Sequence, residues 1–397
     1  MKQFFCILFL LSITFASDRV FVGCEGSFGQ EDGQLWTIDN DLVYPYDLNP
    51  IGSLAQSVAV YKNKLLVTIN GGYKLLVYNI SDSGLSYDRE VLTDDLAPRE
   101  IVVAGDKAYV TTWDPDWYVY PSEPGFVKVV NLESFEIEAS LEVGIMPEDM
   151  IIHDNYLWVA NSGESSVMKI DINDNSISQS LEVGQGPTNL VSYDGDVYVS
   201  RTFYDSNWNT FYGSSKIDIN DNSVLINEYG TGIACGGGIY KYQDSVYRTY
   251  EGGIARIDEN LNIIPESRIG SYGSFEVYSV EVIGDNIYFG LSDYVSPDYV
   301  AVVNNLGEEL YLHETGLLPG DFAGWTCLSD GDINHDGSLD VSDVVVMVSD
   351  IVNQNPFECI LDIDGNTIID VLDVILSVQS IVNGRDGAPA SSVEFIR

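Results

Sequence analysis

Two stretches near the C-terminus space their acidic residues as a calcium-binding loop does. Each loop holds carboxylate or amide side chains at positions 1, 3, 5, 9 and 12, and the second loop follows the first by 30 residues. Ca²⁺ takes about six to eight oxygen ligands, which these side chains and the carbonyl at position 7 can supply. We therefore predict two Ca²⁺ ions. The predicted ligands are Asp332, Asn334, Asp336, Ser338, Asp340 and Asp343 in the first site, and Asp362, Asp364, Asn366, Ile368, Asp370 and Asp373 in the second.

Each loop runs into an apolar segment, Val344–Val352 or Val374–Val382, which we expect to form a helix that packs against its counterpart. This duplicated loop and helix resembles a type I dockerin over residues 328–384. The resemblance implies calcium-dependent folding and attachment to a cohesin-type protein. Positions 10 and 11 hold Val341-Ser342 and Val371-Leu372, where such modules usually present a small hydroxyl pair, so cohesin binding stays open. Thr367 replaces the glycine expected at position 6 of the second loop.

Aromatic residues interleaved with Asp and Asn form a second group that could bind a ligand. They fall in two long insertions, residues 113–120 and 203–212. Aromatic rings stack on sugar faces while carboxylates and amides bind hydroxyls, but Trp and Tyr also dominate protein interfaces. A third possibility is that the insertions pack their rings on each other. The candidates are Trp113, Trp117, Tyr118, Tyr120, Tyr204, Trp208 and Tyr212.

A third group of polar residues recurs at matching places in the repeats described next. Five of them are expected at the mouth of a central channel: Glu100, Asp149, Asn161, Asn189 and Arg201. They could converge on a ligand or a cation. The alternative is an ordinary polar channel filled with water.

A repeat of 40 to 49 residues organises most of the chain. Ser140-Leu-Glu-Val-Gly144 recurs as Ser180-Leu-Glu-Val-Gly184, and strands with related starts make seven units in total. The fourth unit shows four short strands, which are Glu148–His153, Tyr156–Asn161, Val167–Ile172 and Ser176–Val183. Four-stranded units of this length predict an all-β protein, a seven-bladed β-propeller.

The first unit lacks an innermost strand, which the segment Leu317–Trp325 could supply by pairing beside Arg19–Gly23. The propeller resembles YVTN-type surface-layer and YncE-like proteins over residues 18–325. The residues that carry the resemblance are Tyr109-Val-Thr-Thr112, Trp158-Val-Ala-Asn161, Lys169-Ile-Asp-Ile172 and the Val-Gly-x-x-Pro joints. The resemblance implies a binding or structural module. A small α-helical dockerin-like domain follows the propeller.

The N-terminus reads as a signal peptide, with Lys2 before an apolar stretch and cleavage expected after Ala16. We therefore expect a secreted or cell-surface protein with four segments. These are a signal peptide at 1–16, a propeller at 17–325, a dockerin-like module at 326–384 and a tail at 385–397. In an oxidising compartment Cys327 and Cys359 are expected to form a disulfide, while Cys24 and Cys235 are left unassigned.

The net charge of −43 argues against nucleic acid and anionic membranes as partners. The sequence contains only three scattered histidines, and no nucleophile elbow or phosphate-binding glycine loop. We therefore predict a non-catalytic binding protein whose propeller engages a glycan or a protein and whose tail attaches it to a partner or surface. The alternative is an extracellular polysaccharide-active hydrolase or lyase carrying a dockerin, with Glu100 and Asp149 as its paired carboxylates.

Overall fold

The computed structural model describes residues 18–382, except for 40, 48, 82, 117, 120–121, 233–236, 296, 327–330, 334–337, 354–358 and 364–367. Its contacts divide the chain into a large unit, which runs essentially from Val20 to Gly324, and a smaller one formed mainly by the residues from Trp325 onward. We describe the two units separately. In the described part of the chain, no helix has the length and apolar character needed to span a bilayer.

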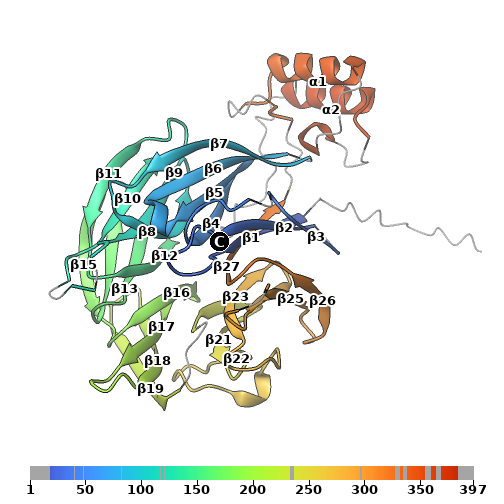
Figure 1. The fold of residues 1–397 in the computed structure, drawn as a ribbon. Coiled ribbons are helices and arrows are strands. Elements are labelled where there is room, and N and C mark those ends of the chain that lie inside the picture. Colours follow the sequence, from blue (N-terminus) through green and yellow to red (C-terminus); the bar gives the residue numbers. More distant parts are fainter. Residues whose placement is uncertain are drawn as a thin grey trace, which may run out of the picture. The chain divides into compact units, whose positions relative to one another are not determined.

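The large unit consists of seven antiparallel sheets, or blades, arranged around a centre (Figure 1). Blade 1 contains β27 (Pro319–Thr326), β1 (Asp18–Cys24), β2 (Gln34–Asp39) and β3 (Leu42–Pro45). Blade 2 contains β4 (Ala55–Tyr61), β5 (Lys64–Ile69), β6 (Lys74–Ser81) and β7 (Gly84–Leu92), with the short helix η1 (Asn70–Gly72). Blade 3 contains β8 (Ala97–Ala104), β9 (Lys107–Trp113), β10 (Phe126–Asn131) and β11 (Ile137–Glu142).

The remaining blades continue the same order of strands. Blade 4 contains β12 (Pro147–His153), β13 (Tyr156–Asn161), β14 (Ser166–Asp171) and β15 (Ser176–Glu182). Blade 5 contains β16 (Pro187–Tyr193), β17 (Asp196–Tyr204), β18 (Thr210–Asp218) and β19 (Val224–Thr231). Blade 6 contains β20 (Ile239–Tyr242), β21 (Ser245–Tyr250) and β22 (Gly253–Arg256). Blade 7 contains β23 (Val277–Ile283), β24 (Asn286–Leu291), β25 (Tyr299–Val303) and β26 (Glu309–Glu314).

The ring closes as the sequence predicts, because β27 pairs beside β1 in blade 1. One sheet therefore joins the last strand of the propeller to its first, and β27 covers the edge of β1 that would otherwise be unpaired. Phe322 of β27 is 2% exposed and packs with Val20 and Val22 of β1 and with Tyr288 of blade 7. Apolar burial between blade 1 and blade 7 thus reinforces the closure.

Blade 6 differs from the predicted four-strand unit. Its described part forms a three-stranded sheet, and only isolated bridges, Ile254 to Ile269 and Ile257 to Ile263, continue it outward. The segment between those bridges contains the short helix η2 (Pro265–Ser267). Proline has no backbone N–H, so it cannot donate to a ladder and interrupts a fourth strand here.

The smaller unit contains two helices, α1 (Val341–Asn353) and α2 (Val371–Val382), and the short helix η3 (Cys359–Leu361). Both helices begin three residues before the predicted starts. The backbone N–H of Ser342 donates to Asp340 Oδ1 (2.6 Å), and that of Leu372 donates to Asp370 Oδ1 (2.7 Å). The aspartate at position 9 of each loop therefore caps the N-terminus of the helix that follows.

The expectation that the apolar faces of the two helices bury each other is only partly correct. Met347 is fully buried with Ile360 and Leu361, and Ile351 and Val374 pack against this core. Most of the remaining apolar side chains are exposed. They repeat with a 30-residue spacing on the two helices: Val341, Val345, Val348 and Val352, then Val371, Ile375, Val378 and Val382. The helices thus leave a duplicated apolar surface uncovered.

Replacing Phe322 tests the closure of the ring. Phe322→Ala removes a buried ring between β27 and its neighbours, so we expect it to lower the free energy of unfolding by about 3–5 kcal/mol in denaturant titration. Phe28, which is 83% exposed, offers a matched control, and Phe28→Ala should change stability by less than about 0.5 kcal/mol. Similar losses from the two substitutions would show that β27 does not hold the ring together.

Candidate functional site

A repeated bulge aims side chains toward the centre of the propeller. In five blades the innermost strand shifts register against the second strand just after the joint that enters the blade. Such a bulge places an extra residue on one strand and redirects its side chain. The first residues of these bulges are Gln56, Arg99, Glu148, Thr188 and Tyr278.

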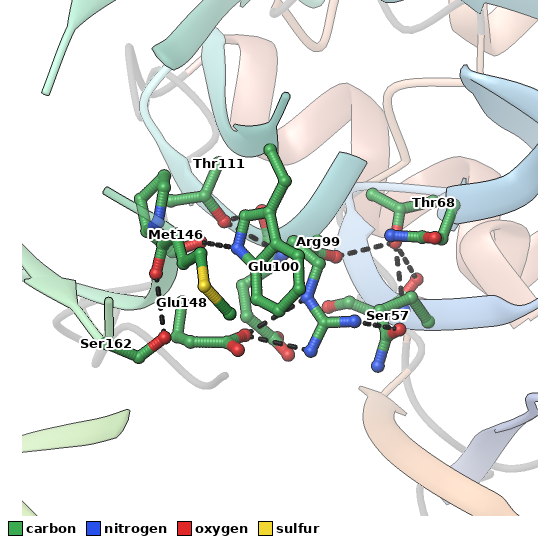
Figure 2. A network of polar contacts seen from close by, with 12 residues as sticks. Ser57, Thr68, Arg99, Glu100, Thr111, Met146, Glu148 and Ser162 are labelled. Carbon is green, nitrogen blue, oxygen red and sulfur yellow. Dashed lines mark hydrogen bonds and ion pairs between the residues drawn. The ribbon is translucent and has the colours of Figure 1, made fainter. Parts of the chain in front are cut away.

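Arg99 joins three blades at this point (Figure 2). Its Nε and Nη2 donate to Glu148 Oε2 of blade 4 (3.1 and 2.9 Å), and its Nη1 donates to Gln56 Oε1 of blade 2 (2.5 Å). The guanidinium carbon lies 4.4 Å from the ring centroid of Trp113, whose Nε1 donates to the Pro147 carbonyl (2.9 Å). Planar stacking and paired hydrogen bonds fix the orientation of this side chain.

Glu25 extends the network into blade 1. Gln56 Nε2 donates to Glu25 Oε1 (3.0 Å), and the Tyr278 hydroxyl of blade 7 also bonds to this carboxylate. At the corresponding place in the joint of blade 1 stands Gly320, where a Cβ atom would lie 2.7 Å from Glu25 Oε1. The glycine leaves the space that the Glu25 carboxylate occupies. We call Glu25, Gln56, Arg99, Trp113, Glu148 and Tyr278 the mouth network.

Three further carboxylates, Glu100, Glu281 and Asp321, interact electrostatically with one another and lie near the network. Asp321 Oδ2 accepts hydrogen bonds from the Ser57 hydroxyl (2.7 Å) and the Val58 N–H (2.8 Å). Burial, with repulsion from Glu100 second, raises the pKa of Asp321 to about 7. Burial and then Asp321 hold the pKa of Glu281 well above its usual range. Asp321 and Glu281 therefore favour the protonated form, because burial penalises the charged form.

Two carboxyl groups of the mouth network also have raised pKa values. Burial raises the pKa of Glu25 to about 7, although Arg99 opposes the shift. Burial also raises the pKa of Glu148, against the attraction of Arg99. Among the described residues at this place, three carboxylates (Glu25, Glu100 and Glu148) therefore share the Arg99 guanidinium, and Glu100 in turn interacts with Glu281 and Asp321. When these carboxyl groups are ionised, the mouth attracts cations and hydroxyl donors and repels anions.

The structure brings only one of the five predicted mouth residues, Glu100, into this group. Asp149 is 1% exposed and accepts from the Leu190 N–H (2.8 Å), which ties blade 4 to blade 5. Asn161 is fully buried between the Gly144 N–H and the Ser166 hydroxyl, and Arg201 is fully buried against Gly184 and Gly213. Asn189 pairs with the Ser200 hydroxyl. These four side chains connect elements of the fold.

The sequence count took Glu100, Asp149 and Asn189 from the third position after each joint, and Asn161 and Arg201 from the fourth position of the second strand. The bulge also places the second position after the joint in the mouth. The signal was present in the four-residue joints such as Pro98-Arg-Glu-Ile101, Pro147-Glu-Asp-Met150 and Pro187-Thr-Asn-Leu190. The sequence did not predict Glu25 as a site residue, because its position depends on the space left by Gly320.

The aromatic candidates divide into packed and exposed rings. Trp113 is half-buried on Arg99, and Tyr212 packs on Tyr229 with centroids 5.3 Å apart. Tyr118, Tyr204 and Trp208 are 70%, 55% and 81% exposed. Trp117 and Tyr120 lie outside the described residues.

Hydrogen bonds to joint carbonyls place both insertions at the joint end of the blades. The Thr202 N–H, at the base of the second insertion, donates to the carbonyl of joint residue Gly186 (2.8 Å), and Trp113 contacts the joint at Pro147. Tyr294, which is 50% exposed, packs edge-on against Tyr278 at 6.0 Å. The exposed rings of blades 3, 5 and 7 therefore lie at the same end of the blades as the mouth network.

The calcium loops are described in part. Asn334, Asp336, Asp364 and Asn366 lie outside the described residues, and within the described part no three acidic, histidine or cysteine side chains gather as metal ligands. Asp343 and Asp373 are fully buried, and Asp362 is 5% exposed. Asp343 accepts from the Ile333 and Asp340 N–H groups, and Asp373 accepts equivalently from Ile363 and Asp370.

Residues 321–384 contain no lysine or arginine to offset these charges. Buried carboxylates require a countercharge, which a bound cation supplies. The donor chemistry of both loops fits Ca²⁺, with Ser338 and Ile368 at the carbonyl position of each. The residues present therefore agree with two calcium ions.

The predicted disulfide falls outside the described structure, because Cys327 and the side chain of Cys359 are not described, and neither is Cys235. Cys24 is a free thiol buried in blade 1. Burial raises the pKa of Cys24 to about 12, so this thiol is unreactive at neutral pH.

The raised pKa values predict how stability depends on pH. A carboxyl group with a higher pKa in the folded chain stabilises it below the unfolded pKa, and this contribution is lost as pH rises to the folded pKa. For Glu25 and Asp321 the window runs from about pH 4 to 7. We expect the melting temperature to fall across this window and Glu25→Gln and Asp321→Asn to make the fall shallower.

The substitution Glu133→Gln, at an exposed position, controls for the change in net charge and should keep the wild-type slope. Identical slopes in all four proteins would mean that the mouth carboxylates are not protonated preferentially in the folded state.

Comparison with known proteins supports the fold and a family. A functionally unknown protein from Desulfotomaculum acetoxidans is similar, with 13% identity over 78% of this chain and 99% of the other and a TM-score of 0.55. Hydrazine synthase from Kuenenia stuttgartiensis is similar over 67% of this chain and 88% of its own, with 13% identity and a TM-score of 0.51. At such identities the likeness concerns the fold. No curated protein matches the chain. A family model matches residues 20–259, and the chain belongs to that family, described as Domain of unknown function (DUF5074).

Proposed function

We propose that the chain is an exported, non-catalytic binding protein whose propeller binds a neutral or amine-bearing glycan at the mouth network. The observation that carries the proposal is the Arg99 assembly, in which a guanidinium, an amide, carboxylates and aromatic rings from several blades meet at one end of the ring. Ligand sites commonly combine a few fixed polar groups with aromatic walls.

The chemistry of the mouth favours sugar hydroxyls over other groups. Arg99 already donates to Glu148 and Gln56, which holds the acceptors in place instead of leaving a cation free for an anionic ligand. Carboxylates accept hydrogen bonds from hydroxyl or ammonium groups. The surplus of negative charge disfavours glycans rich in uronic acid or sulfate.

A second candidate is the polysaccharide-active enzyme named above. The observation in its favour is that the pKa of Glu25 is raised to about 7, as in many general acids. Release of reducing ends from a bound polysaccharide, lost in Glu25→Gln, would support the enzyme. Binding without release supports the binding protein.

The tail has the separate role of attachment in this proposal. The burial of the acidic side chains of Asp343 and Asp373 supports calcium binding, and the duplicated apolar surface of α1 and α2 supports docking to another protein. Exposed apolar surfaces of this kind usually mark interaction sites. The apparent signal peptide supports export.

Glycan binding can be measured on an array that includes β-glucan, xylan, galactomannan, chitosan and polygalacturonate. We expect retention of at least one neutral or amine-bearing polymer and none of polygalacturonate. Glu148→Gln should weaken binding about tenfold or more, because it loses a charged acceptor and unpairs Arg99. Tyr311→Ala, on the outer strand β26, should bind normally. Retention of polygalacturonate alone would refute the proposed ligand class.

Calcium binding can be measured by calorimetry on the whole chain. We expect two bound ions, and Asp343→Ala and Asp373→Ala should each remove one. Asp350→Asn, an acidic residue of α1 outside the loop positions, should retain both. Chelation should unfold the helices, because binding free energy contributes to folding of the module. No uptake at millimolar Ca²⁺, or an unchanged helical signal in excess chelator, would contradict the assignment.

A further inference from the structure

A projecting hairpin of blade 5 carries rings that the mouth network does not use. Strands β17 and β18 each have nine residues, whereas the corresponding β13 and β14 of blade 4 have six. Their pairing continues through Thr202 with Tyr212, Phe203 with Phe211, and Tyr204 with Thr210. We call residues 202–212 the arm.

The base of the arm is stiffened by its own side chains. The rings of Phe203 and Phe211 stack with centroids 5.7 Å apart and planes 16° apart. Because alternate residues of a strand face opposite sides, Tyr204 lies on the other side of this ribbon. The pair of phenylalanines thus supports the ribbon and leaves Tyr204 to solvent.

The tip of the arm is held by a dense set of hydrogen bonds. Asp205 Oδ1 accepts from the N–H groups of Asn207 (2.8 Å) and Asn209 (2.9 Å), and Oδ2 accepts from Asn209 Nδ2 (2.8 Å). The Trp208 N–H donates to the Asp205 carbonyl (3.0 Å). These bonds to the carboxylate lower the pKa of Asp205, so the arrangement persists at neutral pH.

This tip forces Trp208 into a left-handed backbone conformation, with φ of 63°. Bulky residues rarely adopt that conformation, and it persists where surrounding structure imposes it. The result is a tryptophan side chain that is 81% exposed, with the 55% exposed Tyr204 ring 6.1 Å away and tilted by 54°. The arm therefore presents two preorganised rings to solvent.

The surroundings of these rings suit a sugar better than a protein. Protein hot spots sit inside contact patches that exclude water. Trp208 instead stands between exposed, polar Asn207 and Asn209; the Asn207 amide and the Asn209 Oδ1 can bond to hydroxyls, while Asn209 Nδ2 donates to Asp205. Two rings inclined to one another can contact successive units of a twisted sugar chain.

We propose that the arm is a second contact for the glycan, which makes the ligand of the propeller a long polysaccharide chain and not a short oligosaccharide. This inference rests on the proposed function, because the mouth and the arm lie at the same end of the blades. Two linked contacts raise the affinity for a polymer without changing either one.

The experiment compares polymers with short fragments. Native gels that contain soluble β-glucan, xylan, galactomannan or chitosan measure retention of wild type, Trp208→Ala, Trp208→Phe, Glu148→Gln and Tyr311→Ala. The hexasaccharide of each retained polymer is titrated by calorimetry. Trp208→Ala should weaken polymer retention about 5-fold to 100-fold, which is the range for loss of one stacked ring. Trp208→Phe should restore most of it.

Trp208→Ala should leave the affinity for the hexasaccharide unchanged, because a short ligand occupies the mouth alone. If Trp208→Ala retains the polymer normally while Glu148→Gln loses it, the arm has no role and the proposed function stands. If no variant alters retention, or no polymer is retained, both proposals are refuted. Because Trp208 is exposed, an unchanged melting temperature should accompany its loss of binding.

Discussion

The arrangement of the propeller mouth depends on one guanidinium shared by three carboxylates. Arg99 is half-buried, and its pKa is raised by Glu148, Glu25 and Glu100 despite burial. Without it, Glu148 and Glu25 would face one another with no nearby positive charge, at a cost that burial increases. Its stacking on Trp113 and its bond to Gln56 also join blades 2, 3 and 4. One side chain thus determines both the geometry and the charge of the candidate site.

The fold could be predicted because the sequence repeats, so that an error in one strand does not change the number of blades. Seven similar strands starting with an aromatic or apolar residue fixed the number of blades, and the missing inner strand of blade 1 predicted its partner near the C-terminus. The repeat failed where one residue has a special backbone effect. Pro265 interrupts the outer part of blade 6, and Asp340 and Asp370 start their helices earlier than hydrophobic periodicity indicates.

The site was harder to predict than the fold because its geometry depends on β-bulges and on the space that Gly320 leaves by having no side chain. A bulge reveals itself in strand pairing and not in residue type, so the sequence did not single out Arg99 or Glu148. Glu25 belongs to the site because Gly320 lacks a side chain, and these residues are far apart in sequence. Arg201 was predicted at the mouth from its position in the repeat, yet it is fully buried and lies over Phe203.

The central claim is that a glycan occupies the mouth network. Diffraction from crystals of the whole chain soaked in a polysaccharide fragment that it retains tests this most directly. The account predicts sugar density with hydroxyl oxygens within hydrogen-bonding distance of Glu148 or Glu25 and a sugar face near Trp113 or Tyr278. Sugar bound elsewhere on the propeller, with only water beside Arg99 and its carboxylates, would contradict it.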